Sequence, residues 1–369
     1  MQGILCTLIF SFLTLGHVYA IDLSKIKLPE NFQINFAAES VSNARSMTLS
    51  PTGILYVGTR DEGKVYALID NNQDGIFEKK YTLAENLNMP NGVAFHDGDL
   101  YVAEIHKIRK YAKIESNLSK PGPGEVIYDK LPNISHHGWK YIAIGPDGNL
   151  YYPVGAPCNV CLKDGALYSA LHRLNLKSKT STPVAFGIRN TVGFTWHPKT
   201  KDLWFTDNGR DLMGDDVPPC EVNRLSFVGE HFGFPFIHGK NISDPLFGTK
   251  KPEQLKTTPA EIELGAHVAP LGIKFYTGSQ FPSLYNNGMF IAEHGSWNRS
   301  KKSGYKITFI KLDPVAHKKV LLTETFAEGF MLNEKTSGRP VDILIDKDGS
   351  MLVSDDYANA IYRITYKKK

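Results

Sequence analysis

Hydrophobic and polar positions alternate in short runs along most of the chain, and few stretches have the spacing of an amphipathic helix. One pattern recurs six times: an apolar run, a turn of Gly, Asp or Pro residues, and an aromatic-rich second run, as in "MTLSPTGILYVGT" and "GVAFHDGDLYVAE". The six copies begin at Met47, Gly92, Tyr141, Val192, Leu271 and Val341. Asp-Gly and Pro-x-Gly turns between such runs are typical of β-hairpins, so each copy predicts one hairpin.

Several hairpins are followed by another apolar strand, such as "KVYALID", "ALHRLNL" or "AIYRITY". Six multi-strand units in one chain favour an all-β six-bladed β-propeller of four-stranded antiparallel blades over a sandwich, and ring closure leaves few exposed strand edges. Another all-β fold is the alternative. The last two copies are spaced more widely, and the extra residues fall in 230–265 and 312–338. Long insertions on one face of a rigid scaffold often build binding sites.

The first twenty residues differ from the rest. "GILCTLIFSFLTLG" is apolar and uncharged, and "VYA" before Ile21 fits a small-x-small cleavage site. We therefore expect a signal peptide over 1–20, a single propeller domain over 21–369, and a periplasmic or secreted protein. The apolar run is short for a membrane span, so no span is expected.

Composition sets limits on function. The chain is 42% hydrophobic and 22% charged, which is ordinary for a globular protein with a full core. A formal charge of +4 gives no reason to expect nucleic acid as a partner. Three cysteines follow the predicted leader: Cys158, Cys161 and Cys220. An exported protein favours a disulfide, and Cys158 with Cys161 is the first candidate, although the pairing stays open.

Residues that could act in catalysis or ligand binding precede three of the repeated units. His137 in "NISHHGWK" precedes the third copy, Arg189 and Asn190 in "FGIRNTVGF" precede the fourth, and Arg339 in "SGRPVDI" precedes the last. Histidine exchanges protons near neutral pH, and arginine binds carboxylates through two parallel hydrogen bonds. Taken singly, each residue could be structural. Equivalent positions in three blades, however, predict that they converge on one central cavity.

The segment "DNGRDLMGDDVPPCEVN", residues 207–223, carries five acidic groups, two glycines and a Pro-Pro pair. Calcium binds six to eight oxygens from carboxylates and backbone carbonyls, commonly in a loop. The candidate oxygen donors are Asp207, Asn208, the Gly209 carbonyl, Asp215 and Asp216. The segment therefore predicts a cation site after the fourth hairpin, with a solvated loop as the alternative.

With the six copies, the motifs "HHGWK", "IRN", "DNGRD", "HGSWNRS" and "GRPVD" make the chain similar to the soluble pyrroloquinoline-quinone (PQQ) dependent glucose/sorbosone dehydrogenases, most closely the sorbosone branch. The resemblance spans roughly 30–366. It implies a six-bladed propeller with PQQ and Ca²⁺ as cofactors. It also implies oxidation of an aldose hydroxyl or aldehyde hydrate to a lactone or acid, with an external electron acceptor.

The same resemblance implies roles for single residues. His137 matches the general base that takes the proton of the sugar hydroxyl. The implied cofactor contacts are Arg189, Asn190, Asn208, Arg299, Arg339 and Asn91 (or its neighbour Asn88). The implied calcium ligands are the carbonyls of Gly209 and Arg210, with Asp215 or Asp216 nearby. PQQ carries three carboxylates, which arginines and calcium would balance.

Two other functions stay open because propellers carry many activities. One is a calcium-dependent hydrolase of the lactonase type, and the other is a secreted propeller that binds a partner without catalysis. An arginine cluster formed by Arg189, Arg299 and Arg339 would favour the dehydrogenase. Whether the chain forms a homodimer is left open by the sequence.

Overall fold

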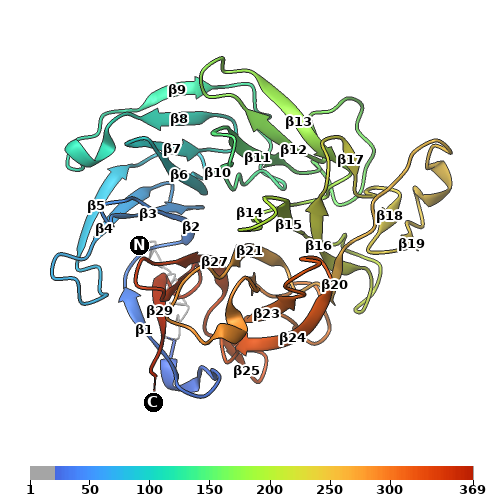
Figure 1. Cartoon of the computed structure of the whole chain (residues 1–369). Coiled ribbons are helices and arrows are strands. Elements are labelled where there is room, and N and C mark those ends of the chain that lie inside the picture. The colour runs from blue at the N-terminus through green and yellow to red at the C-terminus, as the bar shows by residue number, and fades with distance from the viewer. Residues whose placement is uncertain (1–20, 369) are drawn as a thin grey trace, which may run out of the picture.

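The computed structural model describes residues 21–368, and most of its strands form six large sheets arranged in a ring around a central axis (Figure 1). This confirms the predicted all-β six-bladed β-propeller of four-stranded antiparallel blades. Each of the six repeated hairpins supplies the first two strands of one blade, starting with the strand nearest the axis. The predicted signal peptide lies outside the described residues.

The first three blades follow the chain in order. Blade 1 consists of β2 (Ala44–Leu49), β3 (Leu55–Thr59), β4 (Val65–Ile69) and β5 (Lys79–Ala84). Blade 2 consists of β6 (Gly92–His96), β7 (Asp99–Ala103), β8 (Ile108–Tyr111) and β9 (Glu125–Tyr128). Blade 3 consists of β10 (Ala143–Ile144), β11 (Leu150–Val154), β12 (Ala170–Leu174) and β13 (Ser181–Phe186). A short fifth strand, β17 (Glu230–His231), extends blade 3 by pairing parallel to β13.

The remaining blades complete the ring. Blade 4 consists of β14 (Phe194–Trp196), β15 (Leu203–Asp207), β16 (Pro219–Leu225) and β20 (Ile262–Ala266). Blade 5 consists of β21 (Pro270–Phe275), β22 (Met289–Glu293), β23 (Lys306–Leu312) and β24 (Val320–Ala327). Blade 6 consists of β27 (Pro340–Ile345), β28 (Met351–Asp355), β29 (Ala360–Tyr366) and β1 (Phe32–Ala38). Between 21 and 368 the only helices are single 3₁₀ turns at Leu23–Lys25, Ile114–Ser116, Gly248–Lys250 and Ser283–Tyr285.

Blade 6 closes the ring by joining the two ends of the described chain. The N-terminal strand β1 pairs antiparallel with the C-terminal strand β29, from Phe32 opposite Tyr366 to Ala38 opposite Ile361. In Figure 1 the blue strand lies beside the red one near both termini. Phe32 also packs edge-on against Phe281 of the neighbouring blade, with ring centroids 4.7 Å apart. The closing strand is therefore held by backbone pairing and by an aromatic cluster, and it covers an edge that would otherwise be free.

The two long insertions build peripheral structure. Residues 230–265 add β17, the hairpin β18–β19 (Ile237–His238 and Ile242–Ser243) and β20, and this hairpin lies outside the ring in Figure 1. Residues 312–338 supply β24 and the hairpin β25–β26 (Met331–Leu332 and Lys335–Thr336). The insertions thus supply mainly outer strands and hairpins.

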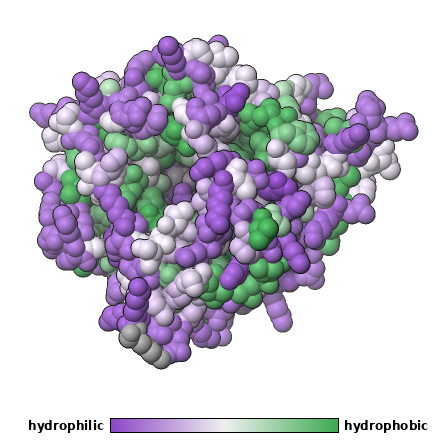
Figure 2. All heavy atoms as spheres, viewed as in Figure 1, coloured by the Kyte–Doolittle hydropathy of each residue, from purple (hydrophilic) through white to green (hydrophobic). Residues whose placement is uncertain are grey.

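The surface is mixed in character. Figure 2 shows hydrophilic side chains over most of the same face, with hydrophobic patches between them. Among residues 21–368, no helix has the length and apolar character needed to cross a bilayer.

Candidate functional site

A cavity of about 580 Å³ lies where loops from all six blades converge. Nearly half of its lining residues come from the segments that run into the innermost strand of each blade, which we call the approach loops, and most of the others from loops that follow the second strand. His137, Arg189 and Arg339 all line it, from the approach loops of blades 3, 4 and 6. The convergence predicted from the repeat is therefore present, and Asn190, Asn208 and Gly209 line the same cavity.

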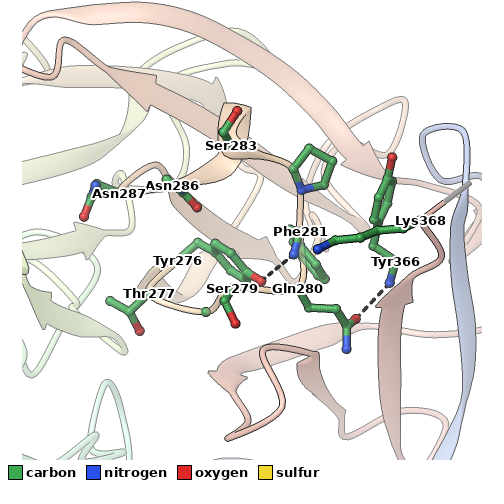
Figure 3. A pocket seen from close by; sticks show the side chains of 12 residues that line it. Tyr276, Thr277, Ser279, Gln280, Phe281, Ser283, Asn286, Asn287, Tyr366 and Lys368 are labelled. Carbon is green, nitrogen blue, oxygen red and sulfur yellow. Dashed lines mark hydrogen bonds between the residues drawn. The ribbon is translucent and has the colours of Figure 1, made fainter.

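A second cavity, of about 600 Å³, lies between residues 276–287 and the C-terminal strand (Figure 3). Its walls are held by hydrogen bonds such as Tyr276 Oη to Gly349 O (2.7 Å) and Tyr366 N to Gln280 Oε1 (2.9 Å). Its lining consists of hydroxyl, amide and apolar groups with one charged side chain, Lys368. Because it has no histidine, arginine or carboxylate, the central cavity is the better candidate for an active site.

His137 presents one ring nitrogen as an acceptor. Its Nδ1 lies 2.8 Å from the carbonyl oxygen of Ala156, and because a carbonyl only accepts, Nδ1 carries the proton; in the neutral ring Nε2 is then the unprotonated nitrogen. The backbone is left-handed here (φ 50°). A Cβ at Gly155 would lie 2.7 Å from the Cβ of His137, so this close approach requires glycine. Burial, followed by the charges of Arg189 and His136, lowers the pKa of His137 to about 2, so the ring is neutral at physiological pH.

Arg189 is almost fully buried, and every nitrogen of its guanidinium has a partner. Nε donates to Asn159 O (2.9 Å), while Nη2 donates to Asn159 Oδ1 (2.9 Å) and Asp211 Oδ2 (3.0 Å). Nη1 donates to the carbonyls of Asn208 (3.1 Å) and Gly209 (2.9 Å). In this structure, groups of the protein itself therefore engage all five N–H groups of Arg189.

A buried carboxylate holds the backbone of the same approach loop. The main-chain nitrogens of Arg189 and Asn190 donate to Asp207 at 2.8 and 2.6 Å. Burial raises the pKa of Asp207 to about 6, although these donors act to lower it. Asp207, which the sequence offers as a calcium ligand, therefore serves here to anchor the loop.

The predicted disulfide supports Arg189 indirectly. Cys158 and Cys161 are bonded, which confirms the first candidate pairing, and Cys220 is a free, buried thiol. Asn159 lies between the two bonded cysteines and makes two of the hydrogen bonds to Arg189. It also links to Asp211 in both directions, at 3.0 and 2.8 Å. The disulfide loop is therefore part of the wall that orients this arginine.

Arg339 is held against blade 5. Its Nε donates to His294 O (2.9 Å) and its Nη2 to Gly295 O (2.6 Å), while its guanidinium lies 5.4 Å from the centre of the Tyr305 ring. Its backbone nitrogen donates to the buried carboxylate of Asp355 (2.8 Å). The second predicted arginine is therefore also preorganised.

Further cations in the cavity were not identified from the sequence. Arg45 forms a buried ion pair with Asp356 (2.9 Å) and also donates to Asn91 Oδ1 (2.8 Å). Arg60 and Arg45 lie 5.3 and 5.8 Å from the ring centre of Trp139, which also lines the cavity. Asn91 itself is fully buried and does not line the cavity, but it contacts the lining residues Arg45 and Met89. Arg45 lies on an inner strand rather than in an approach loop, so no motif pointed to it.

The structure places four other predicted residues outside the cavity lining. Arg210 is buried in an ion pair with Asp244 (2.6 Å). Arg299 binds the Asp216 carboxylate (2.7 Å) and donates to the Asp215 carbonyl (3.0 Å). Asp216 is 85% exposed at its side chain. Within 21–368, no three His, Cys, Asp or Glu side chains are grouped as metal ligands. Two of the five acidic groups of the segment, Asp211 and Asp216, are thus paired with arginines of the chain.

The charge balance of the cavity favours an anion. Four arginines line it, namely Arg45, Arg60, Arg189 and Arg339, against the two carboxylates Asp61 and Asp211. With His137 neutral, the lining has an excess of positive charge in a partly enclosed space, where electrostatic attraction is stronger than in water. A ligand with several carboxylates fits this arrangement.

The fold and the cavity define a six-bladed propeller with a cationic central site, and comparison with known proteins identifies the family. The glucose/sorbosone dehydrogenase family model matches residues 107–298, just over half of the chain, and a TrAA12-like model matches 249–367. An uncharacterized protein of Borreliella burgdorferi is 38% identical over 361 residues, covering 94% of this chain and 92% of its own length. The chain therefore belongs to the glucose/sorbosone dehydrogenase family, and the expectation of an oxidoreductase is confirmed.

Solved structures share the fold at low sequence identity. The calcium structure of a Trichoderma reesei enzyme of family AA12 has a TM-score of 0.77 at 17% identity, with 93% of this chain and 97% of that chain covered. The holo PQQ domain of pyranose dehydrogenase from Coprinopsis cinerea has a TM-score of 0.75 at 16% identity, with 92% and 97% covered. The PQQ-bound aldose sugar dehydrogenase of Streptomyces coelicolor has a TM-score of 0.66 at 16% identity, with 92% and 100% covered.

Proposed function

We propose that this protein is a PQQ- and calcium-dependent sugar dehydrogenase that oxidises an aldose hydroxyl, or an aldehyde hydrate, to a lactone or acid. The observation that carries the proposal is the meeting, in one cavity, of an unprotonated His137 Nε2 with several oriented arginines. Such a site can remove a proton from a neutral substrate beside a polyanionic cofactor. The family and the PQQ-bound relatives support the same assignment.

The residues of the cavity fit PQQ. Arg189, Arg339 and Arg45 would hold its three carboxylates, because guanidinium groups bind carboxylates strongly through charged hydrogen bonds. When bound, PQQ supplies the acceptor for the hydride that leaves the sugar carbon. His137 Nε2 takes the hydroxyl proton of the same sugar, so the two electrons leave with the hydride and the proton remains on the protein. The low pKa of His137 keeps this nitrogen unprotonated before the reaction.

Calcium would bind the carbonyl oxygens of Asn208 and Gly209. Both oxygens accept hydrogen bonds from Arg189 Nη1. A cation at these oxygens would compete with the guanidinium for the same lone pairs and repel it. In this proposal, calcium binding and the turning of Arg189 toward a cofactor carboxylate are therefore coupled. Chelation of calcium should then weaken PQQ binding as well as slow turnover.

We also propose that the protein is exported, as its N-terminal sequence suggests. The disulfide between Cys158 and Cys161 supports this, since disulfides persist in oxidising compartments. An external acceptor would then reoxidise the cofactor.

The test combines cofactor binding and turnover. Purified protein is loaded with PQQ and Ca²⁺, and dye reduction is followed with a panel of sugars, with His137→Ala as the control variant. We expect dye reduction by the wild type with at least one aldose, and a loss of about 100- to 10,000-fold in kcat for the variant at similar PQQ affinity. Absence of both PQQ binding and sugar oxidation would refute the proposal. Lactone hydrolysis without a dye would favour the hydrolase instead.

A further inference from the structure

Two loops are joined at the rim of the central cavity: residues 208–218 after β15 and residues 294–305 after β22. Arg299 binds the Asp216 carboxylate (2.7 Å) and the Asp215 carbonyl (3.0 Å), and Ser300 N donates to Asp215 Oδ1 (3.1 Å). We call these four residues the rim clamp. It links blade 4 to blade 5, and it accounts for residues to which the sequence motifs gave cofactor and calcium roles.

The rim clamp lies next to a tryptophan whose neighbours are fixed on both sides. Ser296 N donates to Ser303 O (2.9 Å), and Ser296 O accepts a hydrogen bond from Tyr305 Oη (2.6 Å). On the other side, Asn298 Nδ2 donates to Asp211 Oδ1 (2.7 Å). Trp297 lies between them, and it lines the cavity although it is 76% exposed. The chain thus holds a large aromatic ring at the cavity mouth and gives it little cover.

This arrangement suits the binding of a flat, partly apolar ligand. A tryptophan presents a broad apolar face with a polar N–H at its edge, and a pyranose ring presents a face of C–H groups bordered by hydroxyls. Because the backbone on both sides of Trp297 is already ordered, binding there loses little conformational entropy. Its high exposure places the indole further out than the buried Arg189. We therefore expect a ring stacked on Trp297 to be a different ring from the one oxidised beside His137.

We propose that Trp297 is an outer sugar subsite, so that the substrate is an oligosaccharide or glycoside whose inner ring is oxidised. This inference rests on the proposed sugar oxidation and specifies its substrate class. The rim clamp acts as a positioning element, since Arg299 and Ser300 lie two and three residues after Trp297 and fix its loop against Asp215 and Asp216.

The experiment compares a reducing disaccharide with its constituent monosaccharide in PQQ- and calcium-loaded wild type, Trp297→Ala, Trp297→Phe and Phe227→Ala. Phe227 is a matched control because it is 66% exposed but does not line the cavity. We expect Trp297→Ala to raise KM for the disaccharide about tenfold, as loss of a stacked ring would, with kcat and the monosaccharide KM unchanged. Trp297→Phe should lie between, and Phe227→Ala should match the wild type.

Calorimetric titration of the disaccharide, with no electron acceptor present, separates this inference from the proposed function. If no sugar is oxidised but the disaccharide binds the wild type and not Trp297→Ala, the subsite stands although the proposed function fails. Equal KM changes for both sugars, or no change for either, would overturn the subsite. A change in KM for the electron acceptor alone would also overturn it, because the indole would then bind the acceptor.

Discussion

Replacing Asp356 by alanine should strongly destabilise the protein, because Asp356 partners two buried groups. Its carboxylate accepts from Arg45 Nη1 (2.9 Å) and from His294 Nε2 (2.8 Å). The side chains of Arg45 and Asp356 are only 2% and 8% exposed. Without the carboxylate, Arg45 would keep Asn91 Oδ1 as its hydrogen-bond acceptor but would lose its counter-ion.

The magnitude follows from the burial of the pair. Removing one partner of a buried ion pair typically costs about 3–5 kcal/mol, since the remaining charge stays desolvated without compensation. We expect about 3 kcal/mol for Asp356→Ala, at the lower end, because Asn91 remains and Arg45 borders the cavity. For comparison, Asp61 pairs with Arg60 (2.8 Å) at side-chain exposures of 54% and 31%, and Asp61→Ala should cost about 0–1 kcal/mol.

The assay is unfolding in guanidinium chloride with the m-value compared between variants. A loss below about 1 kcal/mol for Asp356→Ala at unchanged m, or a loss equal to that of Asp61→Ala, would refute the reasoning from burial. The pH dependence gives a second check. Burial alone would raise the pKa of Asp356, but His294 and Arg45 outweigh it and hold the pKa below 3.8. The stabilisation is therefore complete above pH 3.8 and lost in stronger acid, where wild type and variant should converge.

Three further predictions concern catalysis, cofactor affinity and acid stability. Because the pKa of His137 is lowered to about 2, protonation of this residue should not cause kcat/KM for sugar to fall near pH 6.5. A fall near pH 6.5 whose midpoint shifts in Gly155→Ala, a change beside His137, would contradict the low pKa of His137. Asn159→Ala or Cys158→Ser should weaken PQQ binding about tenfold, measured by fluorescence titration, and leave the sugar KM unchanged. The reason is that Asn159 orients the guanidinium of Arg189, which faces the cofactor. Equal PQQ affinity in variant and wild type would show that this contact is dispensable. Burial lowers the pKa of His231 to about 4, so this residue alone should cost about 3 kcal/mol of stability as pH falls from 6.5 to 4. The acid loss measured in urea titrations should be smaller by about that amount in His231→Asn.

The fold was predictable because the repeated segments consist of residues that form hairpins by local preference. Turns such as Asp147–Gly148 and Asp348–Gly349 lie between alternating apolar runs, and in both glycines φ is positive, as such turns require. The closing strand β1 was not predictable in the same way. Its partner β29 lies at the far end of the chain, so no local pattern signals the pairing.

The site was predictable where a side chain lies in an approach loop and not elsewhere. Arg189 and Arg339 precede the inner strands of blades 4 and 6, so the repeat placed them together. No local sequence pattern indicates Arg45 as a site residue, because its burial depends on an ion pair with Asp356, which lies at the opposite end of the chain. The dense run of acids predicts Asp215 and Asp216 as metal ligands, and the structure adds a partner that the run does not indicate. Their Arg299 partner comes from another blade, which a local pattern does not reveal.

A recurring hydrogen bond between a buried carboxylate and the loop backbone explains why the approach loops carry the site residues. In four of the six repeated units the second strand ends in or just before an acid, as in "LYVAE", "LWFTD" and "LVSDD". In blade 4 that acid, Asp207, accepts from the backbone of Arg189, and in blade 6 Asp355 accepts from the backbone of Arg339. In blade 2 the equivalent Glu104 accepts from the backbone nitrogen of Asn88 (2.8 Å). A buried carboxylate thus fixes the approach loop in three of the six blades. In blades 4 and 6 the anchored loop carries Arg189 or Arg339 and places it at the central cavity. Since the carboxylate binds backbone rather than side chain, the residue at this position can change from blade to blade without loss of the anchor.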